Sequence, residues 1–473
     1  MSKISIKLYR YEILPLLAMY GLCFISVLIE TDFNAVIGGI ISLIIYGICF
    51  FLISKRQGRM IGVVSIFLSL IFVLHCGELV VSIFDYTDYG SYIIPVKSSV
   101  SNEVFFKAFL FSIFSMCFFT TGFIFADTRI NIYPERMESG IEDCYALKKR
   151  IFTGGIILFA VCIIPHAYID FAQWAAYRTS GVYAEIYHIQ IPGIFSILNP
   201  FFYPSIFMII IGCQNVKRAK LVSVLFAAYL IFSMGKGSRI QQLILLAALL
   251  LLYIYYISRR RIRFTQLIVL LFSAYLLVLV INLVGRLRGH GGILDLETVI
   301  DTFKTSSPMD ILLDQLMELG GTEVSLAYAI EIVPNSMFYL LGINYLAGLL
   351  SVYPNVGGLL GKATSFYGFT TSFPDSIRAH NLGGSILGEA YTNFGFIGGC
   401  IVLFVVGIFI AKIDKEFRKA CEFNDVCRLT LLMFLIPNLF LWTRDYFYCM
   451  VYTFFWMSLY LRILLQAKKV KGD

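Results

Sequence analysis

The run Phe33–Ile53, FNAVIGGIISLIIYGICFFLI, and the basic segment directly after it, Ser54–Met60, SKRQGRM, decide the fold of this chain. An uncharged apolar run of about 20 residues forms a helix long enough to cross a hydrocarbon core about 30 Å thick. Lysine and arginine gathered just beyond one end of such a run mark its cytoplasmic end. The stretch therefore predicts a transmembrane helix that ends in the cytoplasm.

Similar runs recur along the whole chain. Of its 473 residues, 59% are hydrophobic and 14% charged, and the mean hydropathy of +0.80 is too high for a soluble domain. We count about twelve runs of roughly 17 to 25 apolar residues, starting with Tyr11–Ile29, which lacks a signal-peptide cleavage site. We expect an all-α polytopic membrane protein with about 12 transmembrane helices, forming a single integral membrane domain over residues 1–473.

Basic residues in the polar breaks set the predicted orientation. With the N-terminus inside, the cytoplasmic segments hold about 27 of the 38 lysines and arginines, as the positive-inside rule requires. Both termini are therefore expected in the cytoplasm. The net charge of +8 follows from this topology and from contact with anionic membrane lipid, so nucleic acid is not expected as a partner.

The cysteines and short motifs argue against a cofactor. Eleven cysteines are scattered singly, without a CxxC pair, so neither a disulfide framework nor a metal site is indicated. Gly361–Thr364 fails the P-loop pattern, and no Asp-x-Asp motif occurs on the predicted outer side. We expect neither metal nor cofactor.

One connection, residues 285–379, is much longer than the others. It spans about ninety residues and is predicted to lie outside, where loops of this length are usually functional. Met309–Ile332 has apolar residues at helical spacing and predicts an amphipathic helix lying on the membrane or on the bundle. Met337–Val352 is short and contains Gly342 and Gly348, so a re-entrant or interfacial segment is expected rather than a crossing.

Several cations on the predicted outer side run against the charge bias and need another explanation. They are Lys236 and Arg239 in a glycine-rich turn, Arg286 and Arg288 where the long connection begins, and Arg378 where it ends. Cations collected at the membrane rim suit a lipid-linked phosphate, because the planar fork of arginine binds phosphate oxygens bidentately. Alternatively, these side chains extend to the lipid headgroups or pair with acidic loop residues.

Two ionisable residues lie inside the third predicted span. His75 and Glu78 are three residues apart, so one helix can bring them into contact. Ionisable groups within the membrane are functional candidates by default, and a structural polar pair inside the bundle is the alternative.

The most specific stretch is Arg378–Gly399, RAHNLGGSILGEAYTNFGFIGG. His380-Asn381, then Glu389, then Gly395 and Gly398, resemble the signature of the O-antigen polymerase and ligase group, the Wzy-like membrane glycosyltransferases. The turn at Gly237–Arg239 resembles the arginine-bearing external loop of the same group. The resemblance implies a GT-C-like ligase and polymerase architecture, although Gly383-Gly384 stand where bulkier residues are common.

The resemblance also implies a function. It predicts an enzyme that polymerises undecaprenyl-diphosphate-linked repeat units on the periplasmic face of a bacterial inner membrane, with a lipid-linked donor and acceptor and a chain-length regulator as partners. Catalysis would fall to His380 or Glu389, the latter alternatively orienting an arginine or binding sugar hydroxyls. The diphosphate or glycan would be bound by Lys236, Arg239, Arg286, Arg288, Arg378 and Asn381. An O-antigen ligase and a lipid-linked oligosaccharide flippase are the alternatives.

Overall fold

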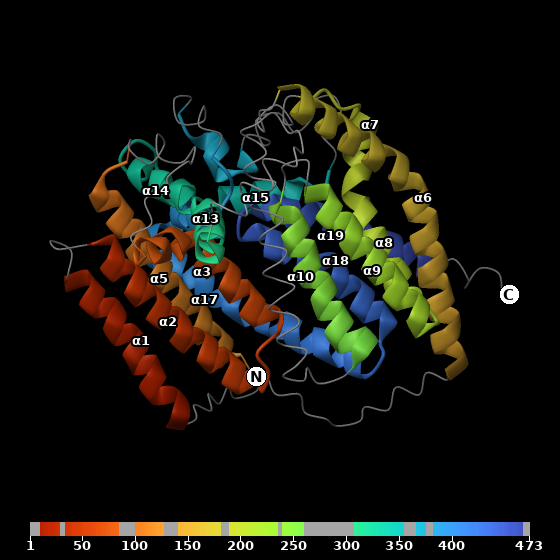
Figure 1. Cartoon of the computed structure of the whole chain (residues 1–473), viewed down its shortest axis with the longest axis horizontal. Helices are drawn as coiled ribbons and strands as arrows, with labels where there is room; N and C mark the ends of the chain where they lie inside the picture. The colour runs from red at the N-terminus through yellow and green to blue at the C-terminus, as the bar shows by residue number, and fades with distance from the viewer. Residues whose placement is uncertain are drawn as a thin grey trace. The chain divides into compact units, whose positions relative to one another are not determined.

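The protein is helical throughout the part of the chain that the structure describes (Figure 1). The computed structural model describes residues 10–28, 34–84, 100–126, 141–180, 189–234, 239–259, 307–353, 366–374 and 382–466. No strand occurs in these ranges, so the predicted all-α class is confirmed.

The chain divides into two compact units, each considered by itself. The first comprises the described residues within Met1–Asn131, Leu316–Glu416 and Leu439–Tyr452. The second comprises those within Ile132–Gln315, Phe417–Asn438 and Thr453–Asp473. Each unit therefore combines segments from distant parts of the sequence, and the single integral domain over residues 1–473 stays a prediction.

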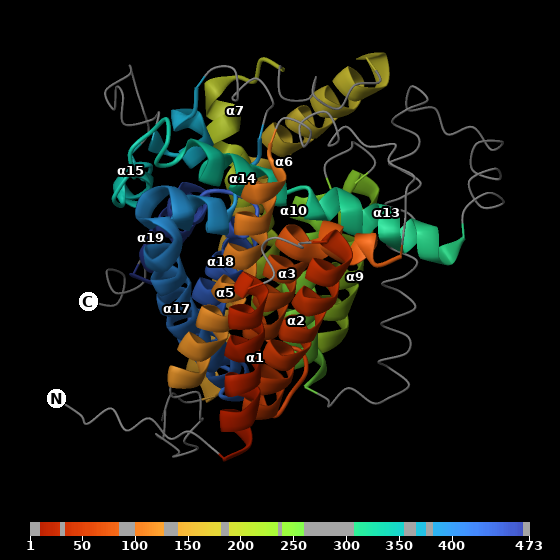
Figure 2. The same cartoon turned by 90° about the vertical axis from the view of Figure 1, so that its left-hand side faces the viewer.

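The first unit is built on four long helices. They are α1 (Arg10–Leu28), α2 (Ala35–Gln57), α3 (Val63–Ser82) and α5 (Asn102–Phe125). They run side by side, with α2 contacting the other three (Figures 1 and 2). The N-terminal part of α17 (Ile386–Glu422), the end of α18 (Val426–Trp442) and the start of α19 (Phe447–Gln466) also belong to this unit.

The second unit is organised around a 40-residue helix, α6 (Ile141–Ser180). Its neighbours in sequence are α7 (Gly193–Leu198), the short η3 (Asn199–Phe201) and α8 (Phe202–Gly212), all of which contact α6. Next come α9 (Val216–Ser233), α10 (Ile240–Leu252) and η5 (Tyr253–Ser258). Contacts of α8 with α9 and of α9 with α10 extend the layer that begins at α6.

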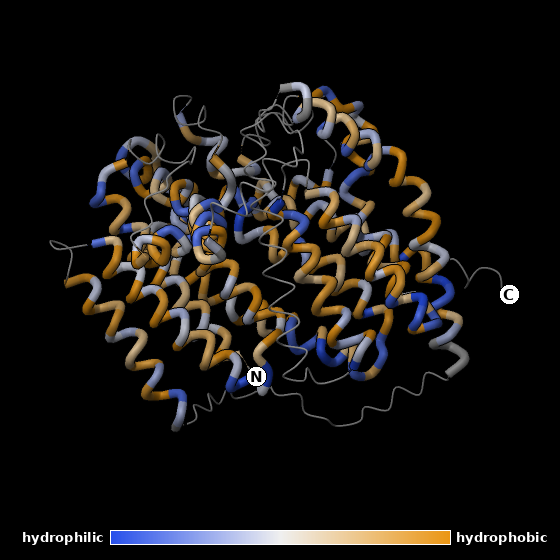
Figure 3. The backbone as a smooth tube through the Cα atoms, viewed as in Figure 1, coloured by the Kyte–Doolittle hydropathy of each residue, from blue (hydrophilic) through white to orange (hydrophobic). Residues whose placement is uncertain are grey.

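The apolar helices agree with the predicted membrane location. In the described ranges, nine helical stretches are long and apolar enough to cross a membrane, and Val426–Trp442 is a shorter apolar helix. Figure 3 shows hydrophobic residues along most of the length of these helices. One of the apolar runs counted in the sequence, Thr265–Leu283, lies outside the described residues, so the number of about twelve stays a prediction.

The described part of the long connection contains three α-helices and the short 3₁₀ helix η8 (Phe369–Ser372). The predicted single amphipathic helix is instead two, α13 (Pro308–Gly320) and α14 (Glu323–Ile332), because the chain turns at Gly320–Thr322. All but one of the residues of α14 are buried, and the helix packs against α5 and α3. The third, α15 (Ile343–Leu350), has 8 residues and would extend only about 12 Å. As expected, this segment is too short to cross a bilayer.

A break at Gly395 divides α17. Its φ of 67° and ψ of −164° are non-helical, in a region that essentially only glycine occupies. The carbonyls of Thr392 and Asn393 at the break accept hydrogen bonds from the N–H groups of Leu340 (3.1 Å) and Leu341 (3.1 Å). The segment before α15 thus satisfies the end of the first half of α17, and Glu389 lies in that half.

We expect Gly395→Ala to destabilise the protein by about 1–3 kcal/mol, because alanine would be forced into this glycine conformation. Its Cβ would also lie 3.0 Å from the hydroxyl oxygen of Tyr339. Gly47→Ala in α2 is the matched control, since a Cβ there meets no atom within 4 Å. The apparent melting temperature of the purified protein in detergent should fall for Gly395→Ala only. Equal melting of the two variants would contradict the strained break.

Candidate functional site

Two of the predicted site residues lie in the described part of the chain. Glu389 belongs to the first unit and Arg239 to the second. The other six, which lie outside the described residues, are Lys236, Arg286, Arg288, Arg378, His380 and Asn381. Their roles stay predictions, and the structure gives the surroundings of Glu389 and of Arg239, each within its own unit.

The start of α17 positions Glu389. The carbonyl of Ser385 accepts a hydrogen bond from the Glu389 N–H (2.8 Å), and its hydroxyl accepts one from the Gly388 N–H (3.1 Å). Ser385 therefore caps the helix. Gly384, just before this cap, lies against Asp445, because a Cβ at Gly384 would come within 2.5 Å of the Asp445 backbone. The Gly383-Gly384 pair thus brings the start of α17 against the turn between α18 and α19.

The Glu389 carboxylate is fully buried, with 0% exposure. Its Oε2 accepts hydrogen bonds from the indole Nε1 of Trp442 (2.8 Å) and from the backbone N–H of Phe447 (3.3 Å). Its Oε1 has no hydrogen-bond partner among the described residues. A buried polar atom without a hydrogen bond costs about 1–3 kcal/mol or more of folding free energy. Oε1 is therefore suited to accept a hydrogen bond from a ligand.

A second buried polar atom belongs to the same neighbourhood. The Tyr345 hydroxyl of α15 is buried and has no hydrogen-bond partner in the described part of the chain. Burial, aided by the nearby negative charge of Glu389, raises the pKa of Tyr345 well above its ordinary value. The hydroxyl therefore stays protonated and can donate or accept a hydrogen bond.

Two asparagines hold α15 against the first half of α17. The Asn393 side chain donates to the Glu389 carbonyl (2.8 Å) and to Asn344 Oδ1 (3.1 Å), and accepts from the Gly342 N–H (2.8 Å). Both asparagine side chains are fully buried. Because a satisfied buried polar network is rigid, this pair fixes the position of Tyr345 relative to Glu389.

The turn between α18 and α19 adds further polar groups. Tyr446 forms a hydrogen bond with the hydroxyl of Thr370, and burial raises the pKa of Tyr446 to about 12. Burial also raises the pKa of Asp445, whose carboxylate accepts a hydrogen bond from the Tyr446 N–H (2.9 Å). Together, Glu389, Tyr345, Asp445 and Tyr446 form a polar cluster, the Glu389 site, at the ends of apolar helices.

His75 lies at the edge of this cluster. Its Nε2 is 3.2 Å from the Ser385 hydroxyl, and both side chains are fully buried. His75 is thus connected to the cap of α17, four residues before Glu389. This contact joins α3 to the start of α17 within the first unit. The sequence did not predict Ser385 as the partner of His75.

Arg239 lies at the start of α10 in the second unit. Its side chain is buried with 6% exposure, and its Nη1 lies 3.5 Å from Gln315 Oε1 of α13. One turn further along α10, the Gln242 amide nitrogen lies 3.4 Å from the Ser233 hydroxyl of α9. A guanidinium stays charged at any working pH.

No metal centre is found in the residues that the structure describes. Within them, no group of three or more histidine, cysteine, aspartate or glutamate side chains is placed to hold an ion.

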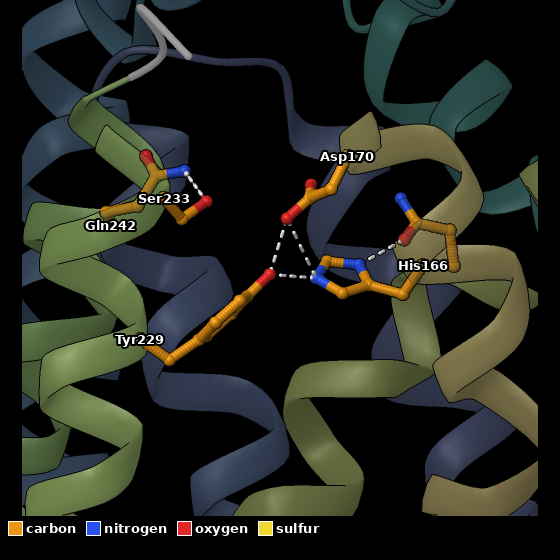
Figure 4. A network of polar contacts seen from close by, with 6 residues as sticks. His166, Asp170, Tyr229, Ser233 and Gln242 are labelled. Carbon is orange, nitrogen blue, oxygen red and sulfur yellow. Dashed lines mark hydrogen bonds and ion pairs between the residues drawn. The ribbon is translucent and has the colours of Figure 1, made fainter. Parts of the chain in front are cut away.

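Sequence reasoning missed several members of the site. Trp442 and Phe447 bind Glu389 across more than fifty residues, and helical periodicity carries no signal of such a contact. Tyr345 and Asn344 were part of an apolar segment without any motif. Outside the Glu389 site, the sequence did contain a signal for a buried polar group. His166 and Asp170 lie four residues apart in an apolar helix, where ionisable side chains are rare (Figure 4).

A comparison with known protein families confirms the resemblance found in the sequence. The family model described as O-antigen polysaccharide polymerase Wzy matches residues 11–470, nearly the whole chain. No curated protein and no solved structure matches.

Proposed function

Because the chain belongs to the O-antigen polysaccharide polymerase Wzy family, we propose that it extends surface polysaccharide from lipid-linked repeat units. It is an integral membrane protein, and the substrates are a growing chain and a repeat unit, each attached to undecaprenyl diphosphate. The growing chain moves from its diphosphate to a sugar hydroxyl of the incoming unit. We place this reaction on the periplasmic face of the bacterial inner membrane. The charge bias directs both termini to the cytoplasm, which leaves the candidate cations and the long connection on the outer side.

The observation that carries the proposal is the divided environment of the Glu389 carboxylate. Trp442 and Phe447 hold Oε2, while Oε1 has no partner among the described residues. A carboxylate held by one oxygen and open at the other suits a general base. The hydroxyl oxygen of the incoming unit bonds to the anomeric carbon of the growing chain, and Glu389 Oε1 takes the hydroxyl proton. The bond from that carbon to the diphosphate breaks, and its electrons stay on the phosphate oxygen.

Arg239 balances the charge that forms on the diphosphate. A guanidinium binds two phosphate oxygens at once and stabilises the negative charge as the glycosidic bond to phosphate breaks. Lys236, Arg286, Arg288 and Arg378 are proposed to assist, Asn381 to contact the glycan, and His380 to be the alternative base. A chain-length regulator is a proposed partner.

Gene deletion tests the proposed activity against its alternatives. Loss of a polymerase leaves single repeat units attached to the lipid core, which a gel resolves as one short band. Loss of a ligase instead leaves long polymer on the carrier lipid, and loss of a flippase leaves undecorated core. We expect the short band, and restoration of long chains by the wild-type gene. Polymer retained on the carrier lipid would exclude the proposed activity.

A further inference from the structure

The helix α15 has its polar and apolar sides reversed. Its buried side carries small or polar residues, namely Asn344, Ala347, Gly348 and Ser351. Its exposed side carries large apolar residues, among which Leu346 is 64% exposed and Leu349 is 53% exposed. A surface helix in water shows the opposite pattern, because it turns its apolar side to the core. The exposed residues, which we call the α15 face, therefore suit an apolar neighbour: they are Ile343, Leu346, Leu349 and Leu350.

Hydrogen bonds hold the other side of α15 against the Glu389 site. Asn344 Oδ1 accepts from the Asn393 amide (3.1 Å), which also donates to the Glu389 carbonyl (2.8 Å). Figure 2 shows α15 next to the start of α19, where a Cβ on Gly348 would come within 2.9 Å of the Phe447 ring. Turning the leucines inward would break these contacts and leave the Asn344 amide without its partner. The α15 face is thus fixed on the outside.

The segment before α15 adds more exposed apolar surface. Phe338 is 90% exposed and Leu341 is 75% exposed. The Leu341 N–H donates to the Asn393 carbonyl (3.1 Å), and its φ of 47° is a left-handed conformation that leucine rarely adopts. The chain therefore presents an apolar side chain outward even where its backbone conformation is unfavourable.

The α15 face adjoins the side of α17 that faces lipid. Ile397, Ile401 and Val405 are exposed and follow one another at helical spacing on α17, which is long and apolar enough to cross a membrane. Just before them lies Phe394, which is also exposed, and the Tyr345 ring of α15 stacks on it with centroids 6.3 Å apart and planes at 13°. The neighbour that suits the α15 face is therefore an aliphatic chain in the membrane.

A cation lies at the same end of the first unit. Arg444 belongs to the turn 443–446, and the residues on either side of this turn, Trp442 and Phe447, both bind Glu389 Oε2. The predicted orientation puts the turn on the outer side, where a cation runs against the charge bias. Arg444 is half-buried, and within the described part of the chain its guanidinium forms no ion pair, even with its acidic neighbour Asp445. Its charge is therefore available to an anion.

We propose that the α15 face binds the polyprenyl chain of the lipid-linked substrate and that Arg444 binds its diphosphate. A cation and an apolar surface on two sides of one site match a lipid with an anionic head. The reacting carbon of this lipid must lie at Glu389 while its chain stays in hydrocarbon, and α15 borders both places. The identity of the lipid as a polyprenyl diphosphate rests on the proposed function.

Contact, rather than affinity, is the quantity to measure for the α15 face. Lipid tails are as apolar as leucine, so exchanging one for a polyprenyl chain adds little binding free energy in a membrane. The head group holds the lipid, and the chain lies along α15 as a consequence. Truncation of a leucine would therefore change the affinity little even where the chain touches it.

Photocrosslinking in nanodiscs measures this contact. The purified full chain receives undecaprenyl diphosphate that carries a diazirine on its first isoprene unit, and a parallel sample receives a phospholipid with a diazirine in its acyl chain. Mass spectrometry then locates the labelled peptides. We expect the first probe to label residues 343–350, and an excess of unlabelled undecaprenyl diphosphate to reduce this label about tenfold or more. The phospholipid label on residues 397–405 is the internal control and should be unaffected by the competitor.

Two variants test the head group. Arg444→Ala should reduce the label on residues 343–350 about tenfold, because the diphosphate no longer holds the chain there. Lys107→Ala is the matched control, since Lys107 is an exposed cation of the same unit whose ammonium is bound by Glu103 (2.6 Å). It should label as the wild type does. The competition experiment uses the wild type, so it does not depend on the folding of any variant.

Two results would overturn the role of the α15 face. They are the absence of label on residues 343–350, and a label there that the unlabelled lipid does not reduce, which would make ordinary membrane lipid the neighbour. Wild-type labelling in folded Arg444→Ala would remove Arg444 from the site. Competed labelling by a protein that does not extend chains would contradict the proposed function and leave the lipid-binding surface standing, whereas chain extension without label on α15 would do the reverse.

Discussion

Replacement of Glu389 by glutamine is expected to slow chain extension by about 100-fold to 10,000-fold, the usual contribution of a general base. Glutamine keeps a side-chain oxygen to accept hydrogen bonds from Trp442 and the Phe447 N–H, so the local fold should survive. It cannot take the proton of the attacking hydroxyl. The measurement is polymer formation by the purified protein from lipid-linked repeat units, resolved by gel at several times.

Glu331→Gln provides the matched control for this prediction. Glu331 lies in the same unit, on α14, and its side chain is exposed. The control should extend chains at the wild-type rate. If Glu389→Gln forms long chains as fast as the control, Glu389 is not the base, and the role passes to His380 or to another group.

The helices could be predicted from the sequence because lipid imposes a simple rule. A segment that crosses the membrane forms a helix because a helix satisfies its own backbone hydrogen bonds. Its side chains must be apolar over the thickness of the hydrocarbon core, and hydropathy measures that directly. The apolar runs Tyr11–Ile29 and Phe33–Ile53 accordingly correspond to α1 and α2. The shortness of Met337–Val352 likewise excluded a crossing, in agreement with the 8-residue α15.

The break in α17 could not be located in the same way. The Gly383-Gly384 pair precedes the helix, and the break lies at the single glycine Gly395. A single glycine in an apolar run is compatible with a continuous helix, which it weakens by only about 1 kcal/mol. The N–H groups of Leu340 and Leu341, distant in sequence, stabilise the break by binding the released carbonyls.

The candidate site likewise contains residues that could be predicted from the sequence and residues that could not. Glu389 was identified because it belongs to a motif, and Arg239 because a cation on the outer side needs an explanation. The partners of Glu389, Trp442 and Phe447, lie on two later helices and have no spacing that connects them to it. Local patterns thus indicate which residues carry charge, whereas tertiary contacts decide which of their atoms remain available to a substrate.

Arg239→Ala should reduce chain extension by about 100-fold to 1,000-fold, the loss typical when one group that stabilises developing charge is removed. Arg239→Lys should give an intermediate rate, because an ammonium keeps the charge but not the planar fork that binds two phosphate oxygens. Arg462→Ala is the control, since Arg462 lies on α19 in the same unit and is exposed. The same polymerisation assay measures all three.

The two arginine variants also separate a chemical role from a structural one. Arg239 is buried near Gln315, so a purely structural arginine would lower the melting temperature of both variants and leave the rate of the folded fraction unchanged. A role at the diphosphate instead requires the rate per folded molecule to fall in the order wild type, lysine, alanine, with undecaprenyl diphosphate binding falling in parallel. A wild-type rate in folded Arg239→Ala would remove Arg239 from the reaction, and the leaving-group charge would then have to be met by the other proposed cations.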